Sequence, residues 1–333
     1  MPLNSARPLA AGVILSLACT AVIALTAGRL TVFELVGPGG AFEYPWRLQR
    51  PTTAARLSAW VGYASHNLAA WGVLAWAQRS KMRFGESFQG ANWLMLSVHG
   101  VFIGLHVLQT QVWYDGLARD VPEVTALGSV ALMLMVVLIL ETPRRGLVLG
   151  KQLPFSRRFL AVVKTTHGYL FSWALIYTFW YHPTEGTVGH LAGFLYIFLL
   201  LWQSVLLFHR AHLNRRWTLF LELLVIPHGV AVAVHQGMGL WPMFAFGFGG
   251  VFVMTQLWGT DLSPTRRKLV VAGYVVGLIT CYALLDRLDQ WHEVFRIPIL
   301  DYGVVLILWG LFGLIHRLLI RVGLITPERH RQK

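Results

Sequence analysis

Residues 91–112 read ANWLMLSVHGVFIGLHVLQTQV, a run that contains no Asp, Glu, Lys or Arg. A stretch of this length and composition crosses the hydrocarbon core of a bilayer as an α-helix. Comparable runs recur along the chain, in which 56% of the residues are hydrophobic and 13% are charged. We therefore predict an all-α, polytopic transmembrane helical bundle with about ten spans. The predicted spans are residues 9–28, 55–77, 91–112, 124–141, 159–181, 187–209, 217–235, 242–259, 268–285 and 299–320.

These spans leave no room for a sizeable soluble domain, so the 333 residues are predicted to form a single integral membrane domain. The spans between residues 55 and 235 carry most of the histidines and of the interior polar side chains. We therefore expect a histidine-rich core at 55–235. The plainer apolar helices at 9–28 and 242–320 are expected at its periphery.

The formal net charge of +13 is distributed unevenly. When the loops are assigned alternately to the two sides of a membrane, most lysines and arginines fall on one side, which marks that side as cytoplasmic. Both termini are then cytoplasmic, in a multi-pass protein of the bacterial inner-membrane type. The basic loops predict contact with anionic membrane lipids and not with nucleic acid, and a soluble electron-transfer partner could dock on them. The basic groups lie at 79–83, 144–158, 210–216, 266–268 and in the tail after Arg317.

Aromatic residues at the span ends are typical of the belts that membrane proteins place at the lipid–water interface. The longest irregular segment is the loop 29–54, which contains Gly37-Pro38-Gly39-Gly40 and Pro45-Trp46 and could cap the outer mouth of the bundle. The belt residues expected from position are Trp113, Tyr114, Trp180, Tyr181, Trp217, Trp241 and Trp258.

The 13 histidines are the polar residues that most need an explanation. Ionisable side chains in hydrocarbon are costly, and they usually face a bundle interior or a cavity. His99 and His106 are seven residues apart, a spacing that returns to within about 20° of one helix face and rises about 10 Å. His228 and His235 repeat this spacing. Two helices should therefore each present an inner and an outer imidazole.

The loop assignment also gives each histidine a depth. The predicted outer layer contains His106, His182, His190 and His235. The predicted inner layer contains His99, His167, His209 and His212, and the residues between the layers are His66 and His228. Pro227 interrupts its span just before His228 and frees backbone carbonyls there. Glu222, on the same span, could orient His228 or carry out acid–base chemistry.

Haem b is the slightly favoured explanation of these histidines. A bis-histidine haem takes one imidazole from each of two facing helices, with small residues beside the porphyrin. His99, His167 and His228 are each followed by glycine, although glycine is also a common packing residue in membrane helices. The candidate haem ligands are His99, His106, His167, His228 and His235, with Glu222 as the candidate catalytic residue.

A non-haem di-iron centre of the membrane hydroxylase or desaturase kind, acting on lipid, is the second explanation. His209 and His212 have a usable helical spacing, but the chain lacks the dense histidine boxes of such enzymes. The candidate metal ligands are His66, His182, His190, His209 and His212.

The third explanation is a histidine-lined proton- or metal-coupled transporter without enzymatic activity. The path would then include further polar side chains, namely those of Gln109, Gln203, Asn67 and Lys164. No inverted repeat supports this class, and glycine-rich phosphate loops and nucleophile motifs of soluble enzymes are absent. The leading interpretation is an integral membrane oxidoreductase with histidine-ligated iron that acts on quinol or another lipid-soluble substrate.

Overall fold

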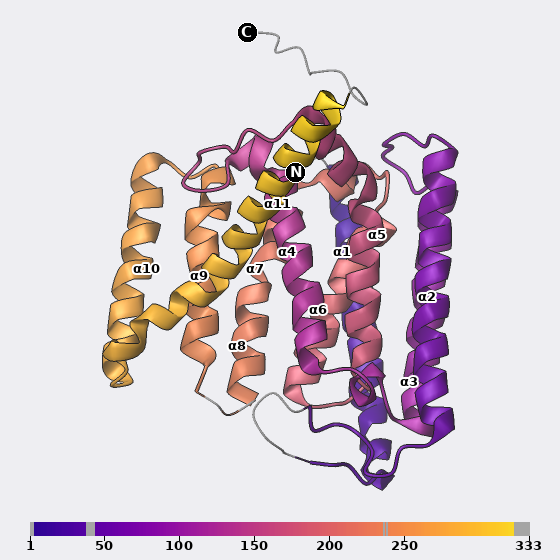
Figure 1. Ribbon diagram of the computed structural model, residues 1–333. Coiled ribbons are helices and arrows are strands. Elements are labelled where there is room, and N and C mark those ends of the chain that lie inside the picture. Colours follow the sequence, from indigo (N-terminus) through magenta and orange to yellow (C-terminus); the bar gives the residue numbers. More distant parts are fainter. Residues whose placement is uncertain (1–2, 38–43, 236, 238, 323–333) are drawn as a thin grey trace. The chain divides into compact units, whose positions relative to one another are not determined.

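The computed structural model describes residues 3–37, 44–235, 237 and 239–322, and the side chains within these ranges except those of residues 3–5 and 316. All regular structure in these residues is helical, and only isolated β-bridges accompany the helices (Figure 1). The predicted all-α class is therefore confirmed. Residues 38–43 of the outer loop and the basic tail from residue 323 onward lie outside the described residues.

The helices follow the predicted spans closely. Eight helical segments of the described residues are long and apolar enough to cross a membrane, and one of them combines α7 and α8. The α-helices are α1 (Leu3–Thr26), α2 (Thr53–Arg79), α3 (Gly90–Trp113), α4 (Glu123–Arg145), α5 (Arg157–Tyr181), α6 (Val188–Val205), α7 (Arg215–Leu223), α8 (Val225–His235), α9 (Trp241–Met254), α10 (Pro264–Leu284) and α11 (Arg296–Arg321). The 3-10 helices are η1 (Ala27–Val32), η2 (Leu117–Arg119), η3 (Arg210–Leu213), η4 (Gln256–Gly259) and η5 (Leu288–Phe295).

Two of the predicted spans stay outside this set of eight. Helix α2 has 27 residues, but its polar and aromatic side chains lower its mean hydropathy. Helix α9 has 14 residues, fewer than the roughly 20 that a helix needs to cross the hydrocarbon core. The structure therefore supports a multi-pass membrane protein with eight candidate crossings.

The chain divides into two compact units. Unit 1 comprises Met1–Met133 and Thr166–Phe248, and unit 2 comprises Leu134–Thr165 and Gly249–Lys333. Every histidine proposed above as a ligand belongs to unit 1. Helix α1, expected at the periphery, packs along α6 within unit 1, where a Cβ at Gly12 would lie 2.2 Å from the Trp202 ring.

The helices of unit 1 alternate in direction, as successive membrane crossings require. At one end, Gly85 between α2 and α3 donates its N–H to the Phe208 carbonyl after α6 (3.0 Å). At the opposite end, the Leu48 N–H donates to Asp115 Oδ1 (2.8 Å), which joins the loop before α2 to the segment after α3. We call the first the basic end, after residues 79–83 and 210–216, and the second the acidic end, after residues 115–123 and 185.

The basic end of unit 1 is fixed by Asn92 in the first turn of α3. Its Nδ2 donates to the carbonyls of Val205 (2.7 Å) and Leu207 (2.8 Å), and its Oδ1 accepts from the Gln89 N–H (2.7 Å). These bonds satisfy carbonyls that the last turn of α6 would otherwise leave unpaired in a buried place. The side chain thereby fixes α3 against the end of α6.

Pro227 breaks its helix as the sequence predicts. Helix α7 ends at Leu223 and α8 begins at Val225, because a proline has no N–H for the carbonyl four residues before it and its ring crowds that carbonyl. The His228 N–H still donates to the Leu224 carbonyl (3.1 Å). The break lies beside the histidine that follows it.

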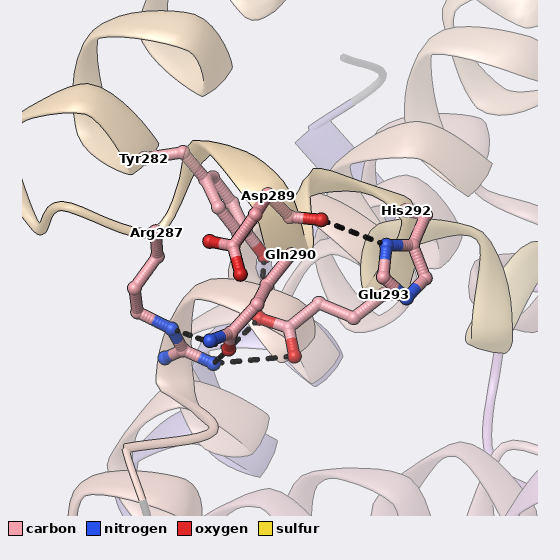
Figure 2. A network of polar contacts seen from close by, with 6 residues as sticks. All are labelled: Tyr282, Arg287, Asp289, Gln290, His292 and Glu293. Atoms are coloured by element: carbon pink, nitrogen blue, oxygen red, sulfur yellow. Dashed lines mark hydrogen bonds and ion pairs between the residues drawn. The ribbon is translucent and has the colours of Figure 1, made fainter.

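Unit 2 has polar networks of its own. Figure 2 shows the turn from α10 into η5, where Tyr282 donates to Glu293 Oε1 (2.8 Å) and Arg287 pairs with the same carboxylate (3.0 Å). Arg287 also donates to Gln290 Oε1 (2.8 Å). His292 lies at the exposed edge of this turn, with its Nδ1 3.2 Å from the Asp289 carbonyl. These contacts hold the turn together.

Candidate functional site

A chain of four side chains runs through the interior of unit 1. His66 of α2 and His99 of α3 touch directly, with Nε2 of His66 2.9 Å from Nδ1 of His99. On the far side of His99, its Nε2 lies 2.7 Å from Oγ of Ser204 near the end of α6. Trp180 of α5 donates its indole N–H to Nδ1 of His66 (3.2 Å). Both imidazoles are almost completely buried, at 0% and 3% exposure.

The hydrogen bonds of this chain fix where each proton lies. The Ser204 hydroxyl donates to the Leu201 carbonyl (2.6 Å), so its oxygen accepts from Nε2–H of His99. The other nitrogen of His99 is then an acceptor, and it takes the bond from Nε2–H of His66. The indole of Trp180 occupies the remaining nitrogen of His66. Both imidazoles are neutral Nε2–H tautomers, and every donor in the chain points toward the basic end.

Trp180 was expected in an interfacial belt, and that expectation is wrong. Its side chain is 1% exposed, and Tyr181 beside it is fully buried. Position at a helix end suggested the belt, but α5 ends inside the bundle, under the segment 44–48. Gly62 of α2 makes room for the indole, because a Cβ there would lie 2.1 Å from Cη2 of Trp180.

His106 lies on the other side of Trp180, toward the acidic end. Its ring centroid is 4.2 Å from that of Trp180 and 4.8 Å from that of Phe179. Its Nδ1 lies 3.1 Å from Oε1 of Gln109, and its Nε2 lies 2.8 Å from the His182 carbonyl. His99 and His106 are both buried, which confirms that their seven-residue spacing places them on an interior face.

The predicted outer layer is partly assembled at the acidic end. The rings of His182 and His190 lie 5.6 Å apart. Tyr44 of the outer loop places its hydroxyl 2.6 Å from Nε2 of His190, and Thr187 holds the other nitrogen at 2.7 Å. The Trp46 ring lies 4.5 Å from that of His190. The described part of the outer loop therefore covers these histidines, as the sequence predicts for a cap.

His182 is a neutral imidazole in this group. Burial lowers the pKa of His182 well below its ordinary value, and the nearby His190, His228 and His106 lower it further. Its Nδ1 is buried and has no hydrogen-bond partner among the described residues. The same holds for Nδ1 of His228. The hydrogen-bonding capacity of these two buried ring nitrogens is not used by the described residues.

His228 and Glu222 lie on either side of the Pro227 break, next to Tyr196 of α6. The rings of Tyr196 and His228 are 5.6 Å apart, and the Tyr196 hydroxyl donates to the Leu221 carbonyl (2.9 Å). Tyr196 also interacts electrostatically with Glu222. His235 ends α8 and is exposed, with its ring against Gly189 and its Nδ1 2.9 Å from the Ala231 carbonyl.

At the basic end, His209 and His212 contact backbone groups, and His167 lies near His212. His209 accepts the Ala211 N–H at Nδ1 (3.0 Å) and contacts the Glu86 carbonyl at Nε2 (2.9 Å). His212 Nδ1 lies 3.0 Å from the Gln203 carbonyl, and its ring is 6.5 Å from that of His167. His209 therefore joins the loop after α2 to the loop after α6.

The arrangement does not suit an iron site as it stands. In the described ranges, no group of three or more His, Cys, Asp or Glu side chains is placed to hold a metal ion. Axial imidazoles lie on opposite sides of an iron, about 2 Å from it, whereas His66 and His99 point at each other across 2.9 Å. Both nitrogens of His99 and of His106 are already engaged.

Most glycines beside the histidines face side chains, whereas Gly100, which follows His99, has no described atom within 4 Å of an added Cβ. Gly62 faces Trp180, Gly168 faces Leu74, and Gly229 faces Phe248. Gly193 faces His228 itself, whose Cε1 would lie 3.2 Å from an added Cβ. These close approaches are helix packing by small residues, as is common in membrane bundles. Since they point at each other, His66 and His99 are not placed as the two axial ligands of one haem.

Several residues of the site were not singled out from the sequence. Trp180 and Ser204 complete the central chain, and Tyr44 and Thr187 hold His190. Ser204 and Thr187 are ordinary residues in membrane helices and turns, so no sequence signal distinguishes them. Tyr44 could have been found from the predicted cap, since an aromatic residue in that loop must lie over the outer histidines.

Comparisons of the chain with protein-family models, with curated proteins and with solved structures give no match. The function must therefore be argued from the site itself.

Proposed function

We propose that this chain is a multi-pass membrane protein that moves protons through the interior of unit 1. The observation that carries the proposal is the direct hydrogen bond between the buried His66 and His99 (2.9 Å). A neutral imidazole has one N–H and one lone pair, so it can accept a proton at one nitrogen and release one from the other. Two such rings in series, continued by the Ser204 hydroxyl, form a proton-transfer chain.

The proton steps follow from the tautomers. A proton added to Nδ1 of His66 lets Nε2 pass its own proton to Nδ1 of His99. His99 then passes its Nε2 proton to the Ser204 oxygen. The Ser204 hydroxyl proton, which the Leu201 carbonyl holds, has to turn from that carbonyl and pass to a water molecule at the basic end. The Trp180 indole covers the entry nitrogen of His66 and must move aside first. Trp180 therefore separates His106 and the acidic end from His66 and His99.

The topology proposed for this function has ten crossings with both termini in the cytoplasm. The alternating directions in unit 1 support it, since the loops with basic residues 79–83 and 210–216 share one end. An excess of Lys and Arg marks the cytoplasmic side. The basic end would then be cytoplasmic, the acidic end external, and the membrane of the bacterial inner-membrane type. Anionic lipids would contact the basic loops.

The test is proton flux in liposomes that contain the purified full-length chain and a trapped pH-sensitive dye. A potassium gradient with valinomycin drives protons inward. We expect the lumen to acidify faster than in protein-free liposomes, at a rate that rises with the amount of protein. A rate equal to that of protein-free liposomes, over a range of potentials and pH, would contradict the proposal.

Iron-dependent oxidation of quinol or lipid stays a prediction from the sequence, and a soluble electron-transfer partner belongs to that prediction. It is tested by the visible spectrum of the purified protein, oxidised and then reduced with dithionite, together with iron analysis. From the engaged nitrogens of His99 and His106, we expect neither a Soret band nor stoichiometric iron. A reducible Soret band would establish haem, and about two irons per chain without it would favour the di-iron centre.

A further inference from the structure

The hydrogen-bonding partners of His106 are all oxygen atoms. Nδ1 faces Oε1 of Gln109 at 3.1 Å, and Nε2 faces the His182 carbonyl at 2.8 Å. A carbonyl oxygen can only accept. A neutral imidazole carries only one N–H. In either neutral tautomer of His106, the nitrogen without a proton points its lone pair at an oxygen, either Oε1 of Gln109 or the His182 carbonyl. Only the doubly protonated ring donates to both partners.

Rotating the Gln109 amide by half a turn does not remove the conflict. Its Nε2 donates to the Asp115 carbonyl (2.8 Å) and to Oγ of Ser58 (3.2 Å). The Ser58 hydroxyl proton is already committed to the Ala55 carbonyl (2.9 Å). In the turned amide, Oε1 of Gln109 would face the Asp115 carbonyl and the Ser58 oxygen, and neither of these has a proton to donate to it. Amide orientation is assigned from such networks, and this network places Oε1 toward His106.

The Trp180 indole beside His106 favours a cation. Its ring lies over Trp180, at 4.2 Å between centroids and 35° between planes. A cation within about 6 Å of an indole centroid is attracted by the negative face of the ring. The titratable side chains that face this place are His66 from α2 and His182 after α5, while Asp115 contributes only its backbone carbonyl, which accepts from Gln109. The His106 ring is 0% exposed and burial opposes a charge on it, so a cation there depends on its two acceptor oxygens and on the indole face.

We propose that His106 binds a proton in the resting protein and is an imidazolium that donates to Gln109 and to the His182 carbonyl. This inference rests on the proposed function, and it makes His106 the proton-binding site on the acidic side of Trp180. His66 and His99, on the other side, remain neutral. The proton held at His106 is then the one that enters the central chain when Trp180 moves aside.

The inference is tested by solid-state NMR of the full-length protein in lipid bilayers, with histidine ring nitrogens labelled with ¹⁵N. Exposed histidines are almost entirely neutral at pH 8. We expect one ring with both nitrogens protonated at that pH, lost in His106→Gln. His66 and His99 should each show one protonated nitrogen.

A second variant keeps the test valid if His106→Gln does not fold. Gln109→Leu removes the acceptor at Nδ1, so the imidazolium signal should disappear at pH 8 while the other histidine signals stay in place. An unprotonated nitrogen on His106 in the wild-type protein would overturn the inference. Because the readout is a chemical shift, a neutral His106 in a protein that still conducts protons would leave the proposed function standing. An imidazolium in a protein without flux would overturn the proposed function alone.

Discussion

Replacing His99 with glutamine is expected to reduce proton flux to the leak rate of protein-free liposomes. Glutamine is close in size and can keep hydrogen bonds to both His66 and Ser204, whose side chains contact His99 at 2.9 and 2.7 Å. An amide cannot accept a proton at one atom and release another at neutral pH. The substitution therefore preserves much of the packing and removes the transfer step. Flux is measured with the trapped dye under a potassium diffusion potential.

The matched control is His235→Gln. His235 is an imidazole of the same unit, but it is exposed at the end of α8 and has no bond to the central chain. Its replacement should leave the flux unchanged. His66→Gln should behave as His99→Gln does, because both rings are needed in series. Flux through His99→Gln at the wild-type rate would show that the His66–His99 bond is structural and that protons move elsewhere.

Thermal unfolding separates loss of transfer from loss of fold. Removing one member of a buried hydrogen-bonded pair and leaving its partner unsatisfied costs about 1–3 kcal/mol. Glutamine restores part of this, so we expect only a small fall in the unfolding temperature of His99→Gln. A large fall together with lost flux would make the variant uninformative about transfer, and His99→Asn would then replace it.

Much of the fold follows from the sequence because the lengths of apolar runs indicate where transmembrane helices lie. The segment 91–112 lies within α3, and 159–181 lies within α5. The position of each histidine along its helix also follows, since the rise per residue fixes it. His182 and His190 are neighbours because a short turn joins their helices.

The partners of the histidines could not be predicted, because the sequence does not say which helices are neighbours. The bond between His66 and His99 depends on α2 packing on α3 at one rotation. His228 and His235 share the spacing of His99 and His106, yet His235 is exposed, because it is the last residue of α8. A seven-residue spacing gives a common face but not a common environment.

Gly62→Ala is expected to destabilise unit 1 strongly. The added Cβ would lie 2.1 Å from Cη2 and 2.3 Å from Cζ3 of Trp180, far inside van der Waals contact. Trp180 is 1% exposed, so neighbouring side chains would have to shift to relieve the clash. Overpacking a close-packed interior typically costs about 1–3 kcal/mol and occasionally more. The unfolding temperature of the purified protein in detergent should fall by several degrees.

The destabilisation by Gly62→Ala is expected to depend on the Trp180 indole, which a double substitution tests. Trp180→Phe removes the outer ring atoms that meet the new methyl group, although it also removes the bond to His66. Gly62→Ala should therefore cost much less in the Trp180→Phe background than in the wild-type protein. The control on the same helix is Gly72→Ala, because a Cβ at Gly72 meets no described atom within 4 Å. Equal costs of Gly62→Ala in both backgrounds would contradict the packing of Trp180 against α2, and with it the placement of the indole between His106 and His66.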